Sequence, residues 1–465
     1  MKKVIDEFNN IHYLDSELGR GGQGVVYRSK DADTVIKFSL HDEKYIKNKR
    51  EIEKFHNTIK KLIFKPIPND INIAKPLAVL KDEAGYVMNL LSEMEPYATF
   101  LPKELSKEKA KELKIPNFLE NVDERSAVYF AHYLQTGGLR RKLYTLSRLA
   151  VTLFRLHARG LIYFDISHNN IFVNDEDIPL VYLIDADNVE YESINNNVVF
   201  TPGFEVPEIV NGEANTLYSD IYAFGILSFL TLTTTHPFDG SDNTKIDWDS
   251  DESEKKEPWE LPWIEDSKDS SNNSSAGLRG RLTITEPLNR LFHSLFEEGK
   301  VDKYKRPTLS LWIQSFEKAA DDTLVCCECQ MSYYDSYFDV CPYCDAEKPK
   351  RLIAISYLYP NKQKTDERWK YVKEVSSEIN TINLPKHLFT SLDVLTIDDT
   401  FLEITFSKKT RVQLFFNKNQ EEVYFKSDTP IQSNRKKISI QSLEDGLAIH
   451  VKSDIELLVE LRLEK

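Results

Sequence analysis

The sequence has no apolar run long enough to span a membrane, and its first residues, MKKVIDEFNN, lack the apolar core of a signal peptide. It also has no excess of basic residues. The net charge of −14 argues against general nucleic-acid binding, which needs a basic surface. We therefore expect a cytoplasmic protein with no membrane segment and no nucleic-acid partner. At 465 residues and 41% hydrophobic content, the chain is long enough for two to four domains with substantial cores.

Cysteine is scarce as well. The five cysteines all lie between Cys326 and Cys344, which excludes scattered disulfides and indicates metal binding in a reducing compartment. Two Cys-x-x-Cys pairs separated by eleven residues would place four thiolates on two tight turns, the arrangement that tetrahedral zinc prefers. The predicted ligands are Cys326, Cys329, Cys341 and Cys344. Cys327 is the spare thiol, because pairing it with Cys329 would make a poorer chelate loop.

Four thiolate ligands would leave no open coordination position, so this zinc would be structural rather than catalytic. A redox dithiol is the alternative, but it would not need two matched pairs. Small zinc ribbons often bind nucleic acid, yet the intervening MSYYDSYFDV is not basic. We therefore expect the ribbon to contact protein.

The stretch with the most chemical information is LIYFDISHNNIFVNDEDIPLVYLIDAD, residues 161–187. It predicts two short apolar strands, 171–173 and 181–184, with Asp165 and Asn170 before the first and Asp185 after the second. Such residues are often only turn formers. The same set also suits phosphoryl transfer, because one carboxylate can accept a hydroxyl proton while an Asn and a second Asp hold a divalent metal against phosphates. Motifs elsewhere in the chain are needed to distinguish between these two interpretations.

A glycine-rich turn lies near the N-terminus, between the predicted strands YLDSEL and VVYRSK. Its glycines would let the backbone approach a phosphate closely, although any glycine-rich hairpin gives a similar spacing. They are Gly19, Gly21, Gly22 and Gly24. A third strand, 34–38, carries Lys37 among apolar residues. A lysine is unfavourable there unless its ammonium meets an anion, such as a nucleotide phosphate; the alternative is an edge-strand lysine.

The segment 42–62 has the periodicity of an amphipathic helix. Its apolar residues, three or four positions apart, are Ile52, Phe55, Ile59 and Leu62. Glu51 and Glu53 are the acidic residues available to Lys37. At about 100° per residue, Glu51 lies about 60° from the middle of the apolar face, whereas Glu53 lies nearly opposite that face. Glu51 is therefore the predicted partner of Lys37. A second helix, 144–159, ends near His157, which we interpret as packed or hydrogen-bonded rather than catalytic.

After residue 187, further short motifs follow in the order found in protein kinases. TPGFEVPE (201–208) resembles the end of an activation segment, SDIYAFG (219–225) the start of the large central helix, and HPF (236–238) the turn after it. Together with the glycine turn, Lys37, YFDISHNN and DAD, the series resembles a protein kinase over roughly 300 residues. The resemblance implies that Glu208 pairs with Arg306 and that Asp220 braces the catalytic loop.

The same resemblance implies a two-lobed α+β kinase fold that uses ATP and Mg²⁺ (or Mn²⁺) to phosphorylate serine or threonine hydroxyls of a protein substrate. Asp165 would orient and deprotonate the hydroxyl, with Asn170 and Asp185 as magnesium ligands. Lys37, held by Glu51, would position the α- and β-phosphates. The remaining nucleotide contacts would come from the glycine turn, Val26 over the adenine, Met88 as gatekeeper, and Asn89 to Leu91 as the hinge.

Three departures from the kinase pattern keep an alternative open. Tyr163 and Phe164 stand before Asp165 where kinases usually have His-Arg, so a phosphorylated activation segment would lack a charge partner there. Ser167 replaces a lysine beside the transferring phosphoryl. Ala-Asp replaces Phe-Gly at 186–187, and Asp187 is either an extra metal ligand or the cap of a turn. The alternative is an ATP-binding pseudokinase scaffold. A small-molecule kinase of the aminoglycoside or choline type fits less well, because those kinases typically lack the Val-Pro-Glu and DIYAFG elements.

The predicted domains are a kinase N-lobe (1–91), a C-lobe (92–320), a zinc ribbon (321–350) and an all-β C-terminal interaction domain, a small sandwich or barrel (351–465). The C-lobe carries an acidic insert, 239–281, whose composition favours a solvated loop. Docking through Trp259 and Trp263 is the alternative. Beyond a helix around 366–382, the tail has six alternating segments typical of strands: FLEITFS, RVQLFF, EEVYFKS, KISIQS, LAIHVKS and LLVELRL.

The order of kinase, zinc ribbon and β-rich tail, with the phrases YFDISHNNIF, LIDADN and LPWIEDS, points to a particular subgroup. It resembles bacterial serine/threonine kinases encoded with a von Willebrand A-type protein of the tellurite-resistance group and a metal-dependent protein phosphatase. The resemblance implies a phosphorylation switch in a bacterial signalling or stress/defence system, with those two proteins as partners.

Overall fold

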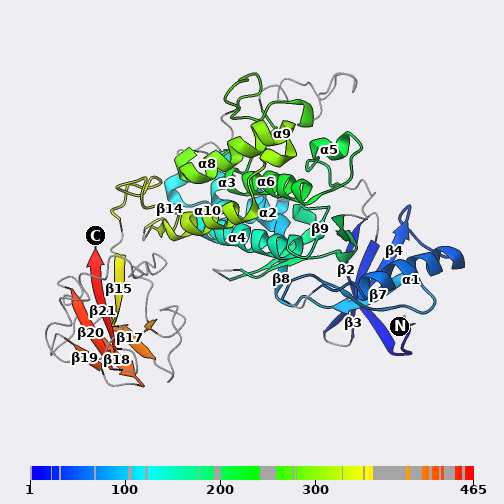
Figure 1. Cartoon of the computed structure of the whole chain (residues 1–465), viewed down its shortest axis with the longest axis horizontal. Helices are drawn as coiled ribbons and strands as arrows, with labels where there is room; N and C mark the ends of the chain where they lie inside the picture. The colour runs from blue at the N-terminus through cyan, green and yellow to red at the C-terminus, as the bar shows by residue number, and fades with distance from the viewer. Residues whose placement is uncertain are drawn as a thin grey trace. The chain divides into compact units, whose positions relative to one another are not determined.

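Figure 1 shows the computed structural model of the chain, which divides into two compact units. The first unit comprises residues 1–115 and 119–317, and the second comprises 116–118 and 318–465. Within 3–348, the structure describes all residues except 22–23, 31–32, 68–69, 103–106, 121–123, 177–178, 193–199, 241–257, 275–276, 279 and 327. Beyond them it describes 351–359, 394–397, 411–417, 422–428, 431–433, 446–452 and 456–464.

A seven-stranded antiparallel sheet forms the N-terminal lobe of the first unit (Figure 1). Its strands lie in the order β1-β2-β3-β4-β7-β6, and β5 pairs with β4. Ile36, Phe38 and Leu40 of β4 are buried in the core of this lobe. Because side chains alternate along a strand, the intervening Lys37 lies on the opposite face. The strand bounds are Lys3–Ile5 (β1), Ile11–Gly21 (β2), Gly24–Ser29 (β3), Thr34–His41 (β4), Lys44–Tyr45 (β5), Pro76–Val79 (β6) and Gly85–Asn89 (β7).

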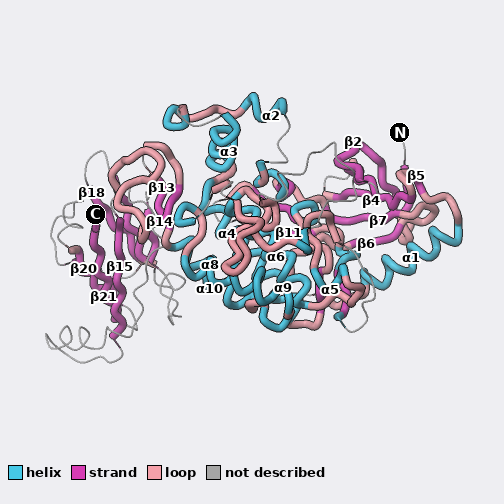
Figure 2. The backbone as a smooth tube through the Cα atoms, turned by 90° about the horizontal axis from the view of Figure 1, so that it is seen from above, coloured by secondary structure: helices cyan, strands magenta, loops and turns pink. Residues whose placement is uncertain are grey.

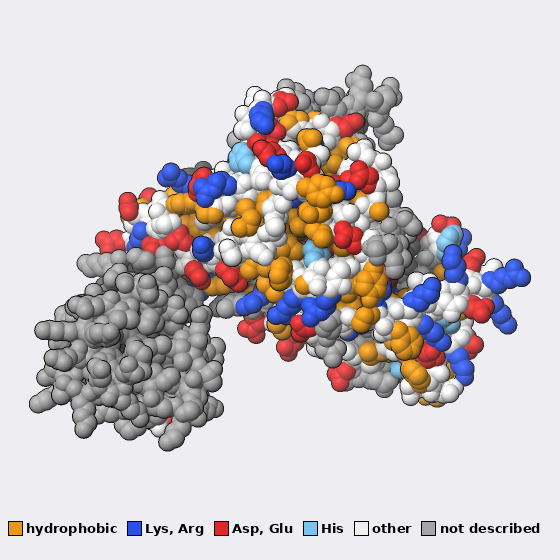
Figure 3. Space-filling model, viewed as in Figure 1, with side chains coloured by type: hydrophobic (Ala, Val, Ile, Leu, Met, Phe, Trp, Pro, Cys, Tyr) orange, Lys and Arg blue, Asp and Glu red, His pale blue; other side chains and the backbone are white. Residues whose placement is uncertain are grey.

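Helix α1 spans Lys49–Ile63 and packs against β6 and β7. It begins later than the predicted residue 42, because Asp42 and Glu43 adopt positive φ angles of 47° and 61° in the turn between β4 and β5. The Asn48 side chain then caps α1 by accepting a hydrogen bond from the backbone N–H of Arg50 at 3.0 Å. Basic side chains are numerous over this lobe, at the right of Figure 3.

The C-terminal lobe is a group of helices around α6, Leu217–Thr233 (Figure 2). The side chains of α6 are buried on nearly all sides. A helix that is apolar all round packs inside a protein core rather than on its surface. Phe224 of α6 meets the rings of Trp312 and Phe316 at centroid distances of 5.9 and 6.1 Å. The other helices are α2 (Lys107–Glu112), α3 (Glu124–Gln135), α4 (Gly138–His157), α5 (Pro207–Val210), α8 (Glu286–His293), α9 (Gly299–Val301) and α10 (Leu309–Asp321).

Two small antiparallel sheets carry the polar stretch 161–187. One pairs β10 (Ile171–Asn174) with β11 (Val181–Leu183) and with β8 (Met94–Pro96). The other pairs β9 (Leu161–Tyr163) with β12 (Val189–Tyr191). The two predicted strands of this stretch are therefore present as β10 and β11, and the candidate residues lie in the loops between these short strands.

The described part of the acidic insert docks on the C-terminal lobe. Trp263 is fully buried, with its ring 5.7 Å from Phe229 and 4.9 Å from His293. The amide nitrogen of Asn272 donates to the backbone oxygens of Phe238 and Pro262 at 3.2 and 2.8 Å. The expectation of a solvated loop is thus wrong for this part, because the buried aromatic ring outweighs the polar composition. Residues 241–257 lie outside the described residues.

In the second unit, β13 (Thr323–Val325) pairs with β14 (Ser332–Tyr334). The described strands after residue 350 form two antiparallel sheets, β15-β21-β20-β19 and β16-β17-β18. Their bounds are Arg351–Tyr359 (β15), Val394–Ile397 (β16), Val412–Asn417 (β17), Glu422–Ser427 (β18), Ile431–Ser433 (β19), Leu447–Lys452 (β20) and Glu456–Glu464 (β21). The predicted helix around 366–382 and the segments FLEITFS and KISIQS lie outside the described residues. Among the described helices, none combines the length and apolarity needed to cross a bilayer.

Candidate active site

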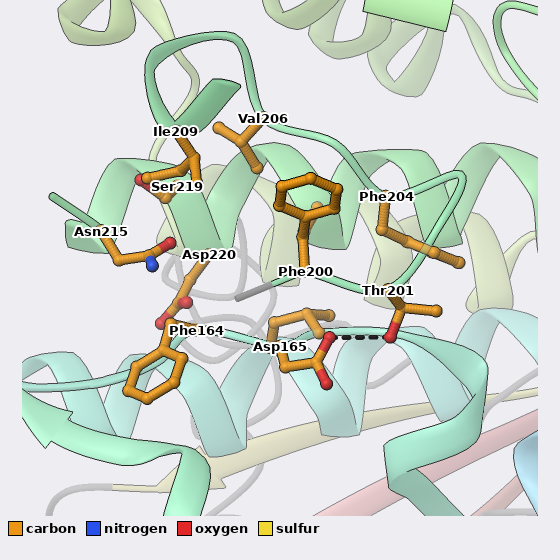
Figure 4. Close-up of a pocket in the computed structure, with 12 residues that line it drawn as sticks. Phe164, Asp165, Phe200, Thr201, Phe204, Val206, Ile209, Asn215, Ser219 and Asp220 are labelled. Carbon is orange, nitrogen blue, oxygen red and sulfur yellow. Dashed lines mark hydrogen bonds between the residues drawn. The ribbon is translucent and has the colours of Figure 1, made fainter. Parts of the chain in front are cut away.

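Asp165 lies at the centre of a hydrogen-bonded frame in the loop between β9 and β10. The side-chain amide of Asn170 donates to its Oδ2 at 2.7 Å and to its backbone oxygen at 2.9 Å. The hydroxyl of Thr201 donates to its Oδ1 at 2.8 Å, as Figure 4 shows, and also contacts the Ser167 hydroxyl at 3.1 Å. Both carboxylate oxygens are thus oriented by donors. Asp165 nevertheless stays partly exposed, so an incoming hydroxyl group can reach it.

Helix α6 supports the loop that carries Asp165. Asp220 accepts a hydrogen bond from the backbone N–H of Tyr163 at 2.7 Å and contacts Nε2 of His157 at 2.8 Å. Asp220 is 1% exposed and its other carboxylate oxygen has no partner among the described residues, so its position depends on these two contacts. The structure therefore confirms that His157 is hydrogen-bonded and that Asp220 braces this loop.

Asp185 is brought beside this frame by the strand pair β10–β11. The backbone N–H of Ile184 donates to the backbone oxygen of Asn170 at 2.9 Å, and the Tyr163 hydroxyl donates to the backbone oxygen of Ile184. Asp185 itself has φ 56° and ψ 63°, in the left-handed region that non-glycine residues rarely adopt. Such backbone strain persists where neighbouring contacts impose it. Here the contacts of Ile184 fix the carboxylate at the edge of the site.

Lys37 reaches the site from the sheet of the N-terminal lobe. Its ammonium pairs with the carboxylate of Asp185. Burial alone would lower the pKa of Lys37, but Tyr86, Asp185 and Asp187 raise it above its ordinary value. The sequence therefore correctly indicated that this lysine meets an anion, and an edge-strand lysine exposed to solvent is excluded.

Glu51 does not make the predicted ion pair with Lys37 in this structure. It is exposed in the first turn of α1, and among the described residues the carboxylate paired with Lys37 is that of Asp185. An acidic residue in the first turn of a helix is stabilised there by the helix dipole, and the exposed Lys47 and Arg50 are close in sequence. Phe55, one turn further along, is the α1 residue that meets Tyr86, with ring centroids 6.4 Å apart.

The glycine turn is the end of the β2–β3 hairpin, which pairs Gly21 with Gly24. A Cβ on Gly24 would lie 3.0 Å from the backbone oxygen of Phe38, so this position favours glycine for close packing. A Cβ on Gly19 or Gly21 would meet no atom within 4 Å, so their side of the hairpin is open. Gly22 lies outside the described residues. Val26 is opposite Lys37 in the register of β3 and β4.

The predicted hinge begins at the end of β7, the last strand of the N-terminal sheet in chain order. Met88 and Asn89 end β7 opposite Val35 and Thr34, and Met88 packs against the cluster of Ile59, Val79 and Tyr86. The backbone N–H of Leu90 donates to the backbone oxygen of Asp33 at 2.9 Å. Leu91 follows between this contact and β8, and is partly buried. The segment thus joins the two lobes beside Lys37.

Glu208 and Arg306, 98 residues apart, form a buried bidentate ion pair with both N–O distances at 2.7 Å. Burial alone would raise the pKa of Glu208, but the hydrogen bonds and charge of Arg306 hold it below its ordinary value. The Ser219 hydroxyl donates to the same carboxylate at 2.9 Å. The predicted pair is confirmed, and it ties the segment after Thr201 to the start of α6 and to the region before α10.

The four predicted zinc ligands also come together, within the second unit. Their sulfur atoms lie within 4.8 Å of one another, and all four thiols are free; they are Cys326, Cys329, Cys341 and Cys344. The two turns match. The N–H groups of Gln330 and Asp345 donate to the oxygens of Cys326 and Cys341, at 3.1 and 3.0 Å, and both donors have positive φ angles near 60°. Cys327 lies outside the described residues.

Three residues near Asp165, Asp185 and Lys37 make contacts that the sequence did not indicate. The Thr201 hydroxyl is 36 residues from Asp165, and the motif TPGFEVPE gave no indication of that bond. The Tyr163 hydroxyl was noted only as a departure, although a tyrosine in a buried strand usually needs a hydrogen-bond partner. Tyr86, opposite Lys37 on β7, carried no motif.

Comparison with known proteins agrees with this geometry. The model of the protein kinase domain matches residues 13–316. Ribosomal protein S6 kinase alpha-3 of Mus musculus is 34% identical over 99 residues, covering 21% of this chain and 13% of that protein. Death-associated protein kinase 2 of Homo sapiens is 32% identical over 113 residues, covering 21% of this chain and 30% of that protein. Death-associated protein kinase dapk-1 of Caenorhabditis elegans is 22% identical over 241 residues, covering 50% of this chain and 15% of that protein.

The chain therefore spans less than a third of the length of each of these relatives. The family model, in contrast, covers more than half of the chain, from β2 to α10. Its span includes both the sheet that carries Lys37 and the helical lobe that carries Asp165. The chain belongs to the protein kinase family.

Proposed function

We propose that this protein is an active serine/threonine kinase that transfers the γ-phosphoryl group of ATP to hydroxyl groups of a protein substrate. The observation that carries the proposal is the frame around Asp165, whose two carboxylate oxygens are held by Asn170 and Thr201. A general base has to be oriented before it can accept a proton in the transition state. The serine/threonine relatives support the choice of acceptor.

In this proposal Asp165 accepts the proton of the substrate hydroxyl as the hydroxyl oxygen attacks the γ-phosphorus. The new oxygen–phosphorus bond forms while the bond from the γ-phosphorus to the β–γ bridging oxygen breaks, and ADP leaves with the bonding electrons. Ser167, which replaces a lysine in the family pattern, contributes no positive charge. We therefore expect slower transfer than in a kinase that retains the lysine.

Asn170 and Asp185 fit the donor set of Mg²⁺ or Mn²⁺, which prefer oxygen ligands. Because the amide nitrogen of Asn170 faces Asp165, its amide oxygen is left for a metal ion. The bound ion would neutralise phosphate charge as it develops. Lys37 would move its ammonium from Asp185 to the α- and β-phosphates. The backbone of the hairpin with Gly19, Gly21, Gly22 and Gly24 would cover the phosphates.

The adenine would lie between the N-terminal sheet and the hinge. Val26 is on the strand at one side of the strand of Lys37, and Met88 is near the end of the strand at its other side, so both are suited to apolar contacts with the ring. Asn89 and Leu91 would offer backbone groups as hydrogen-bond partners. Mutation of Val26 to a larger residue, Val26→Phe, is expected to weaken ATP binding without affecting the zinc cluster.

The test is incorporation of radiolabelled phosphate from ATP into a generic protein substrate by the wild type and by Asp165→Ala. The proposal predicts labelling by the wild type and its loss in the variant. Equal labelling by both would contradict the assignment of Asp165. The second candidate, an ATP-binding pseudokinase scaffold, is favoured by the pairing of Lys37 with the metal ligand Asp185. Thermal-shift titration with Mg-ATP separates the two, because binding without turnover would support the scaffold.

We also propose that the four-cysteine cluster binds one structural zinc ion. Two sulfur pairs, Cys326–Cys344 and Cys329–Cys341, are 3.5 and 3.6 Å apart. These separations are close to the edge of about 3.8 Å that tetrahedral Zn–S bonds of about 2.3 Å require, and far from a disulfide of about 2.05 Å. The test is to measure the zinc bound by the wild type and by Cys341→Ser. Equal zinc content in the two proteins would contradict the proposed zinc site.

For the biological setting, we propose the partners suggested by the subgroup resemblance, a von Willebrand A-type protein and a metal-dependent protein phosphatase. The support is the succession of kinase, cysteine cluster and C-terminal strands in one chain. Coexpression with the products of neighbouring genes, followed by mass spectrometry of phosphosites, tests this proposal. Phosphosites on those proteins that disappear with Asp165→Ala would support it, and their persistence would oppose it.

A further inference from the structure

Tyr86 is the residue directly opposite Lys37 on the neighbouring antiparallel strand, β7. Residues paired in this way lie on the same face of the sheet, with Cβ atoms about 4.5–5.5 Å apart. Tyr86 is only 3% exposed; burial raises the pKa of its phenol, while the charge of the nearby Lys37 ammonium lowers it. A buried phenol needs a polar partner for its hydroxyl, and an ammonium group has three donors to offer.

The Tyr86 ring is fixed independently of Lys37. It stacks on Phe55 of α1 with an interplanar angle of 16°, and it belongs to a buried cluster with Ile59 and Val79. The hydroxyl is therefore carried by a ring that packs against both the sheet and helix α1. Glu51, the residue expected on this helix to hold Lys37, is exposed instead. The helix thus contacts the lysine's surroundings through an aromatic stack rather than through a carboxylate.

The present carboxylate partner of Lys37 is Asp185, which the proposed function also assigns to the metal. When the ammonium turns from Asp185 to phosphate, it needs another protein group to keep it in place. We propose that Tyr86 is the positioning residue of Lys37, and that its hydroxyl accepts a hydrogen bond from the ammonium while the remaining N–H groups face the nucleotide phosphates. This inference rests on the proposed function, because it assigns a role within the same site.

The test uses Tyr86→Phe in the full chain, which removes the hydroxyl and keeps the ring on Phe55. Hydrogen bonds to charged groups change equilibrium constants by about tenfold or more, so we expect the Kd and KM for Mg-ATP to rise by about that factor. In a Lys37→Ala background the same substitution should change Mg-ATP affinity by less than about twofold, because the group it positions is gone. The matched control is Tyr222→Phe. That buried hydroxyl has no hydrogen-bond partner among the described residues, and its removal should leave ATP binding and turnover unchanged.

Three outcomes would overturn the inference. The first is a wild-type Kd for Mg-ATP in Tyr86→Phe, and the second is an equal loss of affinity in the presence and absence of Lys37. The third is a larger loss of affinity in Glu51→Gln than in Tyr86→Phe, which would show that α1 supplies the partner after all. Because Mg-ATP affinity is measured without turnover, these outcomes remain distinct from failure of the proposed function. That failure would appear as absence of phosphate transfer by the wild type.

Discussion

Replacing Thr201 with valine should slow phosphate transfer while leaving ATP binding intact. The substitution removes the hydroxyl that donates to Asp165 at 2.8 Å and keeps the branched shape of the side chain. A hydrogen bond to a charged group contributes about 1.5–3 kcal/mol. If that energy is needed to keep the carboxylate aligned in the transition state, kcat should fall by about 10- to 100-fold. Asp165 keeps its bond from Asn170, so activity should not disappear entirely.

The assay is steady-state kinetics with γ-labelled ATP and a generic serine/threonine substrate. The KM for ATP should be unchanged, because the hydroxyl of Thr201 bonds to Asp165 and Ser167 and not to Lys37 or Asp185. Thr201→Ser is the matched control, since it keeps the hydroxyl and should retain activity within about threefold. A wild-type kcat for Thr201→Val would refute the reasoning. Equal losses in both variants would show that the effect is not specific to the hydroxyl, because Thr201→Ser keeps it.

Three further predictions concern the lobe that supports the site. Arg306→Met should lower the free energy of unfolding by about 3–5 kcal/mol, because it leaves the Glu208 carboxylate buried without its partner; a loss below about 1 kcal/mol in chemical denaturation would oppose this. The pKa of Glu208 is lowered, so its contribution to stability is present above its unfolded pKa of about 4.3 and is lost as pH falls through the lower folded value. Wild type should therefore lose stability more steeply than Arg306→Met in acid denaturation below about pH 4, and parallel curves would contradict the argument. Trp263→Ala should cost about 3–5 kcal/mol in thermal unfolding, and clearly more than Trp259→Ala, because only Trp263 is fully buried.

The features best predicted from the sequence depend on local spacing or on the order of motifs. Asp165, Asn170 and Asp185 flank one pair of short strands, so a turn of limited length is enough to bring them together. Glu208 and Arg306 are far apart in sequence, but each lies in a motif whose place in the order was informative. The two cysteine turns could be predicted equally well, because the ligands of each turn are only three positions apart.

The features that could not be predicted from the sequence depend on how helices, strands and loops that are far apart in the chain pack together. Helical periodicity places Glu51 beside the apolar face of its helix, but it does not determine where that helix lies relative to Lys37. The side chain points to solvent, and Phe55 makes the contact with the sheet instead. The hydroxyl of Thr201 reaches Asp165 across 36 residues, a contact set by tertiary packing. The composition of the insert favoured a solvated loop, although its tryptophans left docking open, and the structure buries Trp263.

We propose Asp165 as the base of a phosphate-transfer site. The most direct measurement is the single-turnover rate of transfer from γ-labelled ATP to serine- and threonine-containing peptides, for wild type and Asp165→Asn, with Mg-ATP affinity measured on both. Asparagine keeps the size of the side chain but cannot accept the proton as a carboxylate does. We expect unchanged ATP affinity and a fall in rate of about 100-fold or more. A variant that transfers phosphate at the wild-type rate would contradict it.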